Sequence, residues 1–125
     1  YPTPTPGSGP GRGMMDPQDR LWFGEYRGNG IGMFDTRTER FQEWFAPRPS
    51  APYDIAVDKN GEVWTGSMLS DRVLRLDPKT DQFTEYLLPK STNVRRMFVD
   101  NSTTPVTLWI GSDHGASIIK LELVD

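Results

Sequence analysis

Short segments in which apolar and polar residues alternate run along the whole chain. In residues 82–87 (Gln-Phe-Thr-Glu-Tyr-Leu) the alternation has a period of two, which is typical of a half-buried β-strand. Turn-forming sequences such as Asp58-Lys59-Asn60-Gly61 and Asp77-Pro78-Lys79-Thr80 separate these segments. The further predicted strands are 21–24, 31–35, 40–45, 54–58, 62–66, 72–77, 96–100, 107–111 and 118–123. No apolar stripe has the 3.6-residue period of a helix over a useful length, so the pattern predicts an all-β chain.

An internal repeat organises these strands. The motif Trp-x-Gly occurs at Trp22, Trp64 and Trp109, with spacings of 42 and 45 residues. A shift of 42 also superposes Asp16 on Asp58, while the third spacing is longer because residues 101–107 replace a tight turn. Four short antiparallel strands in about 42 residues are the period of a β-propeller blade. The three tryptophans are expected to pack as core between neighbouring blades, because one recurs in every unit.

The repeat predicts a partial β-propeller over residues 1–125, with four-stranded blades at about 8–45, 50–87 and 92–125. The third blade is expected to lack its outer strand, and residues 1–7, with Pro at positions 2, 4 and 6, are expected to be an extended connector. Known propellers have about four to eight blades, so three cannot close a ring. We expect the chain to be part of a larger ring. The alternative is a second copy that completes six blades.

Composition and charge exclude several classes of chemistry. The chain has no Cys, which excludes disulfides, zinc–thiolate sites, Fe–S ligation and thiol nucleophiles. Its 14 Lys and Arg against 17 Asp and Glu give a net charge of −3, without the cationic excess of a nucleic-acid-binding surface. No segment approaches the roughly 18 apolar residues of a membrane span, and no signal-peptide pattern is present. Nucleotide-binding glycine loops, His-Glu-x-x-His and Gly-x-Ser-x-Gly are also absent.

The candidate ligand-binding residues gather on one predicted rim. Successive strands are antiparallel, so the loops between second and third strands share a rim with the segments that lead into the first strands. Irregular loops on a rigid scaffold are where binding residues concentrate. This rim collects Glu25, Arg27, Tyr53, Arg95, Asp113 and His114.

Each candidate on the rim has a functional and a structural interpretation. Arg95 and Arg96 either bind an anion at the channel mouth or divide into one rim arginine and one salt-bridged arginine. His114, the only histidine, is a base or metal ligand oriented by Asp113, or an exposed loop residue. Glu25 is a functional carboxylate or the partner of Arg27.

The repeat motifs resemble those of the virginiamycin B (streptogramin) lyase-like propellers. The matching segments are Asp19-Arg20-Leu21-Trp22-Phe23-Gly24-Glu25, Asn29-Gly30-Ile31-Gly32-Met33-Phe34-Asp35 and Phe41-Gln42-Glu43-Trp44 with Pro47. The resemblance covers essentially the whole chain and implies a seven-bladed fold, of which this chain is similar to the last three blades. In such rings the N-terminal segment of the full protein usually supplies the missing outer strand.

The resemblance also implies an activity and the residues that would carry it. The lyases linearise a cyclic depsipeptide antibiotic by elimination at an ester, which needs a base and a magnesium ion. Their His follows the Pro that opens an innermost strand, and their Glu follows the next Trp. The corresponding residues here are Gly11, Tyr53 and Arg95, and only Glu25 remains after a Trp, because the other two units have Ser67 and Ser112.

We therefore expect a binding-type propeller segment with a small molecule, a peptide or a protein at the loop rim. No cofactor, metal, nucleic acid or membrane insertion is expected. One alternative is a C–O lyase with Mg²⁺ that opens streptogramin B-type cyclic depsipeptides. Another is a structural module whose partner, either the remaining blades or a second copy, completes the propeller by strand addition. The family resemblance implies a periplasmic or secreted location, with the cytoplasm as the alternative.

Overall fold

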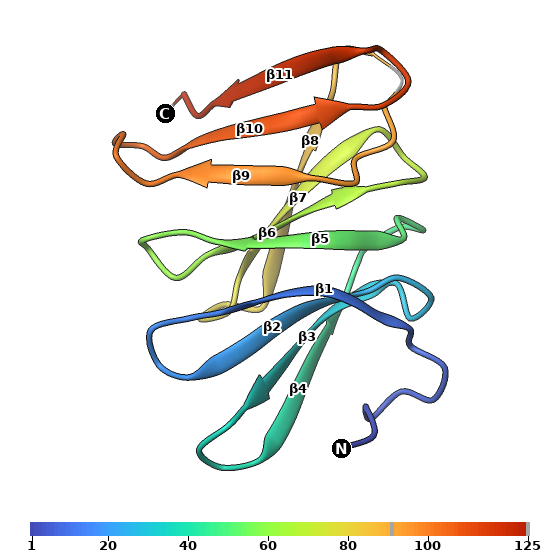
Figure 1. Ribbon diagram of the computed structural model, residues 1–125, viewed down its shortest axis with the longest axis vertical. Coiled ribbons are helices and arrows are strands. Elements are labelled where there is room, and N and C mark those ends of the chain that lie inside the picture. The colour runs from blue at the N-terminus through green and yellow to red at the C-terminus, as the bar shows by residue number, and fades with distance from the viewer. Residues whose placement is uncertain (91, 125) are drawn as a thin grey trace.

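A computed structural model describes residues 1–90 and 92–124 as three antiparallel sheets (Figure 1). The first sheet contains β1 (Pro10–Met15), β2 (Arg20–Glu25), β3 (Gly30–Asp35) and β4 (Arg40–Phe45). The second contains β5 (Pro52–Val57), β6 (Val63–Ser67), β7 (Arg72–Asp77) and β8 (Gln82–Leu87). The third contains β9 (Met97–Asp100), β10 (Thr107–Ser112) and β11 (Ser117–Glu122). The described residues contain no helix, and therefore none that could cross a membrane.

Each sheet is a meander in which successive strands are neighbours. The first strands of the three sheets, β1, β5 and β9, follow one another through the stack, and the other strands of each sheet fan away from them (Figure 1). The predicted all-β propeller fold is confirmed, and the third sheet contains three strands within residues 92–124.

Two apolar clusters hold the three sheets together. The cluster between the first and second sheets contains Trp22, Ile31, Trp44, Ile55, Val57, Val63 and Leu76. Within it the indole rings of Trp22 and Trp44 stack with their centroids 5.3 Å apart. The cluster between the second and third sheets contains Ala56, Trp64, Val73, Leu88, Val94, Met97, Val106, Leu108 and Ile110. The predicted core positions of Trp22 and Trp64 are thus confirmed, and each indole removes roughly 150–250 Å² of surface from water.

A buried aspartate fixes each of these two tryptophans to the turn that precedes it. Asp58 Oδ2 accepts a 2.9 Å hydrogen bond from Trp64 Nε1, and its Oδ1 accepts bonds from the backbone N–H groups of Asn60 and Glu62. Asp16 holds Trp22 in the same way at 2.9 Å. Burial raises the pKa of Asp16, but hydrogen bonds from Trp22 and Arg20 outweigh it and hold the pKa below its usual value.

The third repeat departs from this arrangement, because Trp109 belongs to neither of the two inter-sheet clusters of the described residues. Trp109 is 39% exposed, and no sheet formed by the described residues lies on its face. Asp100 instead accepts hydrogen bonds from the backbone N–H and hydroxyl of Ser102 within the longer turn. The ammonium of Lys120 lies 5.5 Å from the centroid of the Trp109 ring.

The N-terminal residues are not extended throughout, contrary to the expectation of a polyproline-like connector. The backbone N–H of Ser8 donates to Thr5 O at 3.2 Å and closes a turn. The Tyr1 ring lies 4.8 Å from that of Phe34, so the segment folds back against the first sheet.

Candidate functional site

The loop rim is the end of the molecule formed by the β2–β3, β6–β7 and β10–β11 turns and the segments that lead into β1, β5 and β9. Backbone hydrogen bonds hold these two sets of loops together in the first two sheets, and in the third sheet one joins the end of β10 to the segment that leads into β9. Arg27 N donates to Ser8 O at 3.0 Å, Met68 N donates to Ser50 O at 2.9 Å, and Gly111 N donates to Arg96 O at 3.3 Å. The antiparallel order of the strands therefore places the predicted candidates on one rim.

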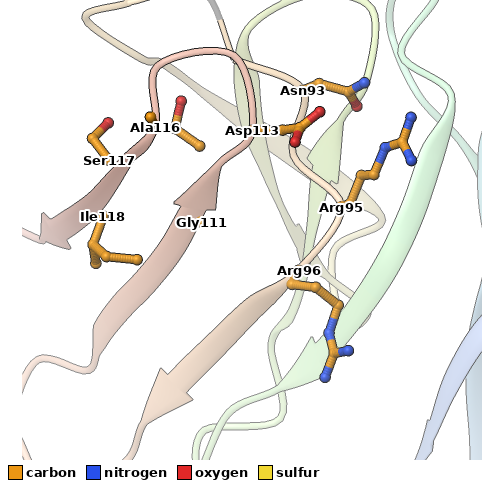
Figure 2. Close-up of a pocket in the computed structure, with 9 residues that line it drawn as sticks. Asn93, Arg95, Arg96, Gly111, Asp113, Ala116, Ser117 and Ile118 are labelled. Atoms are coloured by element: carbon orange, nitrogen blue, oxygen red, sulfur yellow. The ribbon is translucent and has the colours of Figure 1, made fainter.

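A cavity of about 490 Å³ opens on the rim of the third sheet, between the segment that leads into β9 and the β10–β11 turn (Figure 2). It is lined by Asn93, Arg95, Arg96, Gly111, Ser112, Asp113, Ala116, Ser117 and Ile118. We call this space the third-sheet cavity. Of the six predicted binding residues, Arg95 and Asp113 are brought together there.

The two adjacent arginines play different parts in this cavity. Arg96 Nε lies 3.8 Å from Asp54 Oδ2, and its guanidinium lies 5.6 Å from the centroid of the Phe98 ring. Asp54 Oδ2 also accepts a 2.9 Å bond from Met97 N and so fixes the start of β9. Arg95 forms no ion pair within residues 1–90 and 92–124. The charge of Arg96 is therefore partly neutralised, whereas that of Arg95 is available to a ligand.

The shape of the β10–β11 turn comes from the repeat, and only its side chains differ. Ala116 has a left-handed φ of 46°, and the residues at the same position of the other two sheets, Asn29 and Asp71, have φ values of 59° and 53°. Ser112 Oγ accepts a 3.1 Å hydrogen bond from Gly115 N inside the turn. The backbone strain at Ala116 is thus a property of the fold and does not itself indicate a binding site.

His114 lies in the same turn but does not line the third-sheet cavity. His114 is exposed to solvent. In the part of the chain that the structure describes, no three His, Cys, Asp or Glu side chains gather where they could hold a metal ion.

Tyr53 and Arg27 lie elsewhere on the rim, between the first and second sheets. The Tyr53 ring meets Tyr26 edge-to-face at 6.3 Å, and the guanidinium of Arg12 lies 5.7 Å from its centroid. Arg27 lies next to Gly9, because a Cβ at Gly9 would stand 3.2 Å from Arg27 Cγ. Arg12 was absent from the sequence candidates, although the 42-residue shift superposes it on Asp54 and Arg96 at the mouth of the neighbouring sheets.

Glu25 is buried beneath the rim rather than open to it. Glu25 is fully buried, and neither of its carboxylate oxygens has a hydrogen-bond partner among the described residues. Burial, reinforced by the neighbouring Glu43 carboxyl, raises the pKa of Glu25 to about 8. Thr5 Oγ1 donates to Glu43 Oε1 at 2.9 Å, so the N-terminal segment covers this carboxyl pair. No ion pair joins Glu25 to Arg27 among the described residues, and the alternative of a Glu25–Arg27 pair is wrong.

Comparison with known proteins finds that the chain is similar to several solved structures. No family model and no curated protein matches the sequence. The chain is similar to a structure of selenomethionine-substituted virginiamycin B lyase from Staphylococcus aureus, with 26% identity and a TM-score of 0.76 over 98% of this chain and 44% of that one. It is also similar to a streptogramin B lyase structure, with 18% identity and a TM-score of 0.74 over 98% of this chain and 43% of that one.

Propellers of other kinds share the fold at lower identity. A structure of YCF48 bound to a D1 peptide has 13% identity and a TM-score of 0.66 over 85% of this chain and 34% of that one. The chain spans less than half of the length of the lyase structures it matches. The predicted resemblance to the virginiamycin B lyase-like propellers is confirmed at the level of structure.

Proposed function

We propose that this chain, a β-propeller of the virginiamycin B lyase-like family, binds a small organic anion in the third-sheet cavity, with Arg95 as the anchoring cation. The observation that carries the proposal is the guanidinium of Arg95, which has no carboxylate partner among residues 1–90 and 92–124. The cavity volume of about 490 Å³ lies within the roughly 300–1,000 Å³ of small-molecule sites.

The chemistry of the wall favours an anion that carries a planar charged group. A guanidinium presents paired N–H donors that match a carboxylate in a bidentate arrangement. Arg96 adds a second, partly neutralised guanidinium on the same side of the cavity. Figure 2 shows the two guanidinium groups pointing apart, so Arg95 anchors the carboxylate and Arg96 adds a second positive charge at longer range.

Isothermal titration calorimetry with 4-methylpentanoate tests this proposal. Arg95→Gln removes the anchoring charge and is expected to weaken binding at least tenfold, since hydrogen bonds to charged groups contribute about 1.5–3 kcal/mol. Arg40→Gln is the matched control, because Arg40 is an exposed arginine on β4 of the first sheet without an ion pair in the described structure. Equal affinity for wild type and Arg95→Gln would contradict the proposal.

Lyase activity is the second candidate, and the structural similarity to two streptogramin lyases supports it. The residues themselves argue against it, because Gly11, Tyr53 and Arg95 stand where the family carries its His. Incubation with virginiamycin B and Mg²⁺, followed by mass spectrometry of the antibiotic, decides the question. Ring opening that is lost in Glu25→Ala or His114→Ala would replace the binding proposal.

Two uncovered apolar faces also support a role for partner sheets. On the first sheet, Leu21, Phe23, Phe34 and Phe41 line an apolar cavity of about 460 Å³ with Tyr1. On the third sheet, Phe98 is 59% exposed and lies beside Trp109, which is 39% exposed. Further propeller sheets or a second copy would bury these faces. Light scattering separates the two partners, since a well-folded monomer of 14.2 kDa would contradict association between copies.

A further inference from the structure

The chain contains two Asn-Gly dipeptides, Asn29-Gly30 and Asn60-Gly61. In such a pair the backbone nitrogen of the glycine can attack the side-chain amide of the asparagine, because glycine has no side chain to hinder the approach. The reaction is intramolecular, so its rate depends on whether the local structure allows the two groups to meet. The two dipeptides are identical in sequence, and the fold around each decides which of them reacts.

The Asn60-Gly61 pair lies in an open turn between β5 and β6, at the end of the stack opposite the loop rim (Figure 1). Both residues are exposed, and the Asn60 side chain forms no hydrogen bond to the described residues. Gly61 has a left-handed φ of 79°, and a Cβ placed on it would meet no atom within 4 Å. The Gly61 N–H donates to Asp58 O at 3.0 Å, and this exposed turn bond is the one that must open before the nitrogen can react.

The Asn29-Gly30 pair is held on both sides of the reacting atoms. Asn29 Oδ1 accepts a 2.7 Å hydrogen bond from Ser50 N, and its Nδ2 donates to Arg48 O at 3.0 Å. Gly30 is buried at the start of β3 and pairs with both neighbouring strands. A Cβ on Gly30 would stand 2.6 Å from Trp44 O, so the backbone there is closely packed. The side-chain amide and the nitrogen that would attack it are therefore both fixed.

We propose that Asn60 is a site of spontaneous deamidation in the folded chain and that the fold protects Asn29. The Gly61 amide nitrogen loses its proton to water and attacks Asn60 Cγ. The new N–Cγ bond closes a succinimide ring, the Cγ–Nδ2 bond breaks, and ammonia leaves after it takes up a proton. Water then opens the ring at either carbonyl carbon and leaves aspartate or isoaspartate at position 60.

The modification would act on the contact that joins this turn to the core. Asp58 Oδ1 accepts the backbone N–H of Asn60 at 2.8 Å, and Asp58 Oδ2 holds the buried indole of Trp64. Isoaspartate lengthens the backbone of the turn by one carbon, and either product places a second carboxylate near Asp58, which it repels. Deamidation of Asn60 should therefore loosen the hydrogen bonds that hold Trp64.

Peptide mapping of the aged protein tests the proposal within one sample. Trypsin cleaves after Lys and Arg and so places Asn60 in peptide 60–72 and Asn29 in peptide 28–37, neither of which contains another Asn or a Gln. The folded chain is incubated at mildly alkaline pH, and mass spectrometry follows the change of amide to carboxyl in each peptide against an unaged sample. Peptide 60–72 should convert at least tenfold faster than peptide 28–37. In urea the two should convert at similar rates, because the protection of Asn29 comes from the fold.

Asn60→Gln is the matched variant, since the 42-residue shift places Gln18 at the same position of the first-sheet turn, where Asp19 has a φ of 61°. Peptide 60–72 of this variant should not convert. Aged wild type should unfold at a lower urea concentration than fresh wild type, while the variant keeps its midpoint. Equal conversion of the two peptides in the folded chain, or none in peptide 60–72, would overturn the proposal. Conversion without a shift of the midpoint would establish the site and overturn its effect on Trp64.

Discussion

In the second sheet, more of the polar side chains that recur in each repeat have hydrogen-bond or ion-pair partners than in either neighbouring sheet. Asp58 uses both carboxylate oxygens to hold a turn and the buried indole of Trp64, whereas in the third sheet Asp100 bonds only within its turn and Trp109 is 39% exposed. The second sheet is also the one that has a described sheet packed on each face. Sequence repetition therefore preserves the residue, while the neighbouring sheet and the turn length decide what that residue does.

The first sheet departs from the second at a different position. Ser67 in the second sheet donates to Ser50 O at 2.8 Å and accepts a bond from Ser70 N at 2.8 Å. Glu25 occupies the same position in the first sheet and has no partner. Glu85 of the second sheet pairs with Arg48 at 2.7 Å, whereas its counterpart Glu43 lies beside Glu25. The same sheet geometry thus holds a neutralised carboxylate in one case and a carboxyl pair in the other.

Removal of the repeated tryptophan should show the largest contrast between the second and third sheets. Trp64→Ala is expected to lower the free energy of unfolding by about 3–5 kcal/mol, because it leaves a cavity in the inter-sheet core. Trp109→Ala should cost less, about 1–2 kcal/mol, since Trp109 is 39% exposed and lies outside both inter-sheet clusters. Urea denaturation followed by circular dichroism measures both. Equal losses would mean that a further sheet covers Trp109 in solution.

The aspartates should follow the tryptophans with a smaller contrast. Asp58→Ala leaves the Trp64 indole N–H and two turn N–H groups without their acceptor, which is expected to cost about 2–3 kcal/mol. Asp100→Ala removes bonds only from exposed Ser102 and should cost less than about 1 kcal/mol. The same denaturation assay compares them. A cost for Asp100→Ala as large as that for Asp58→Ala would remove the distinction between the two turns.

The sequence predicted the fold well because its signals are local. The turn residues, the apolar residues of 72–77 and the alternation of residues 82–87 predicted β7 and β8 with their observed bounds. The repeat requires β1, but its sequence Pro-Gly-Arg-Gly-Met-Met shows no alternation, since glycine and proline interrupt it. The repeat motif predicted the residue type at Trp109 but not its exposure, because burial depends on which sheet lies opposite and a repeat motif does not contain that information.

The candidate site was predicted less completely, for a related reason. Chain direction alone placed Arg95 and Asp113 on one rim, and the structure brings them to one cavity. The division of roles between Arg95 and Arg96 depends on Asp54, a residue of the neighbouring sheet. The burial of Glu25 depends on Glu43 from β4 and on the N-terminal segment. Such contacts join distant parts of the chain, and no spacing within one motif reveals them.

The carboxyl pair of the first sheet should make stability depend on pH. The pKa of Glu25 is raised to about 8 in the folded chain by burial and by Glu43, from 4.5, so the folded state holds a proton that the unfolded state releases between these values. The stabilisation is complete below the unfolded pKa and is lost as the pH rises through the folded pKa. The free energy of unfolding should fall by roughly 1 kcal/mol between pH 6 and pH 7.

Two variants isolate this effect from the second sheet. Glu25→Gln, which cannot ionise, should abolish the fall across this pH range. Glu85→Gln removes a partner of Arg48 and should leave the fall in place. Chemical denaturation at a series of pH values measures both, and a fall that persists in Glu25→Gln would assign it to another group.

The smallest effect is expected where the second and third sheets touch through their turns. Lys59 Nζ donates to Thr103 O and Thr104 Oγ1, both at 2.8 Å, on the exposed surface. Lys59→Ala should lower the free energy of unfolding by about 0.5 kcal/mol, because water replaces exposed hydrogen bonds readily. A loss above about 2 kcal/mol would show that the long turn of the third sheet is held by this contact.

The stacked indoles of the first sheet have an optical consequence. Trp22 and Trp44 lie 5.3 Å apart with their planes 23° from parallel, and two identical chromophores at this distance share their excitation. They should produce an exciton couplet in circular dichroism. Trp64 stacks on Tyr86 instead, and these unlike rings absorb at different energies. The first sheet therefore carries its own spectroscopic label, by which its unfolding can be followed separately from that of the other two.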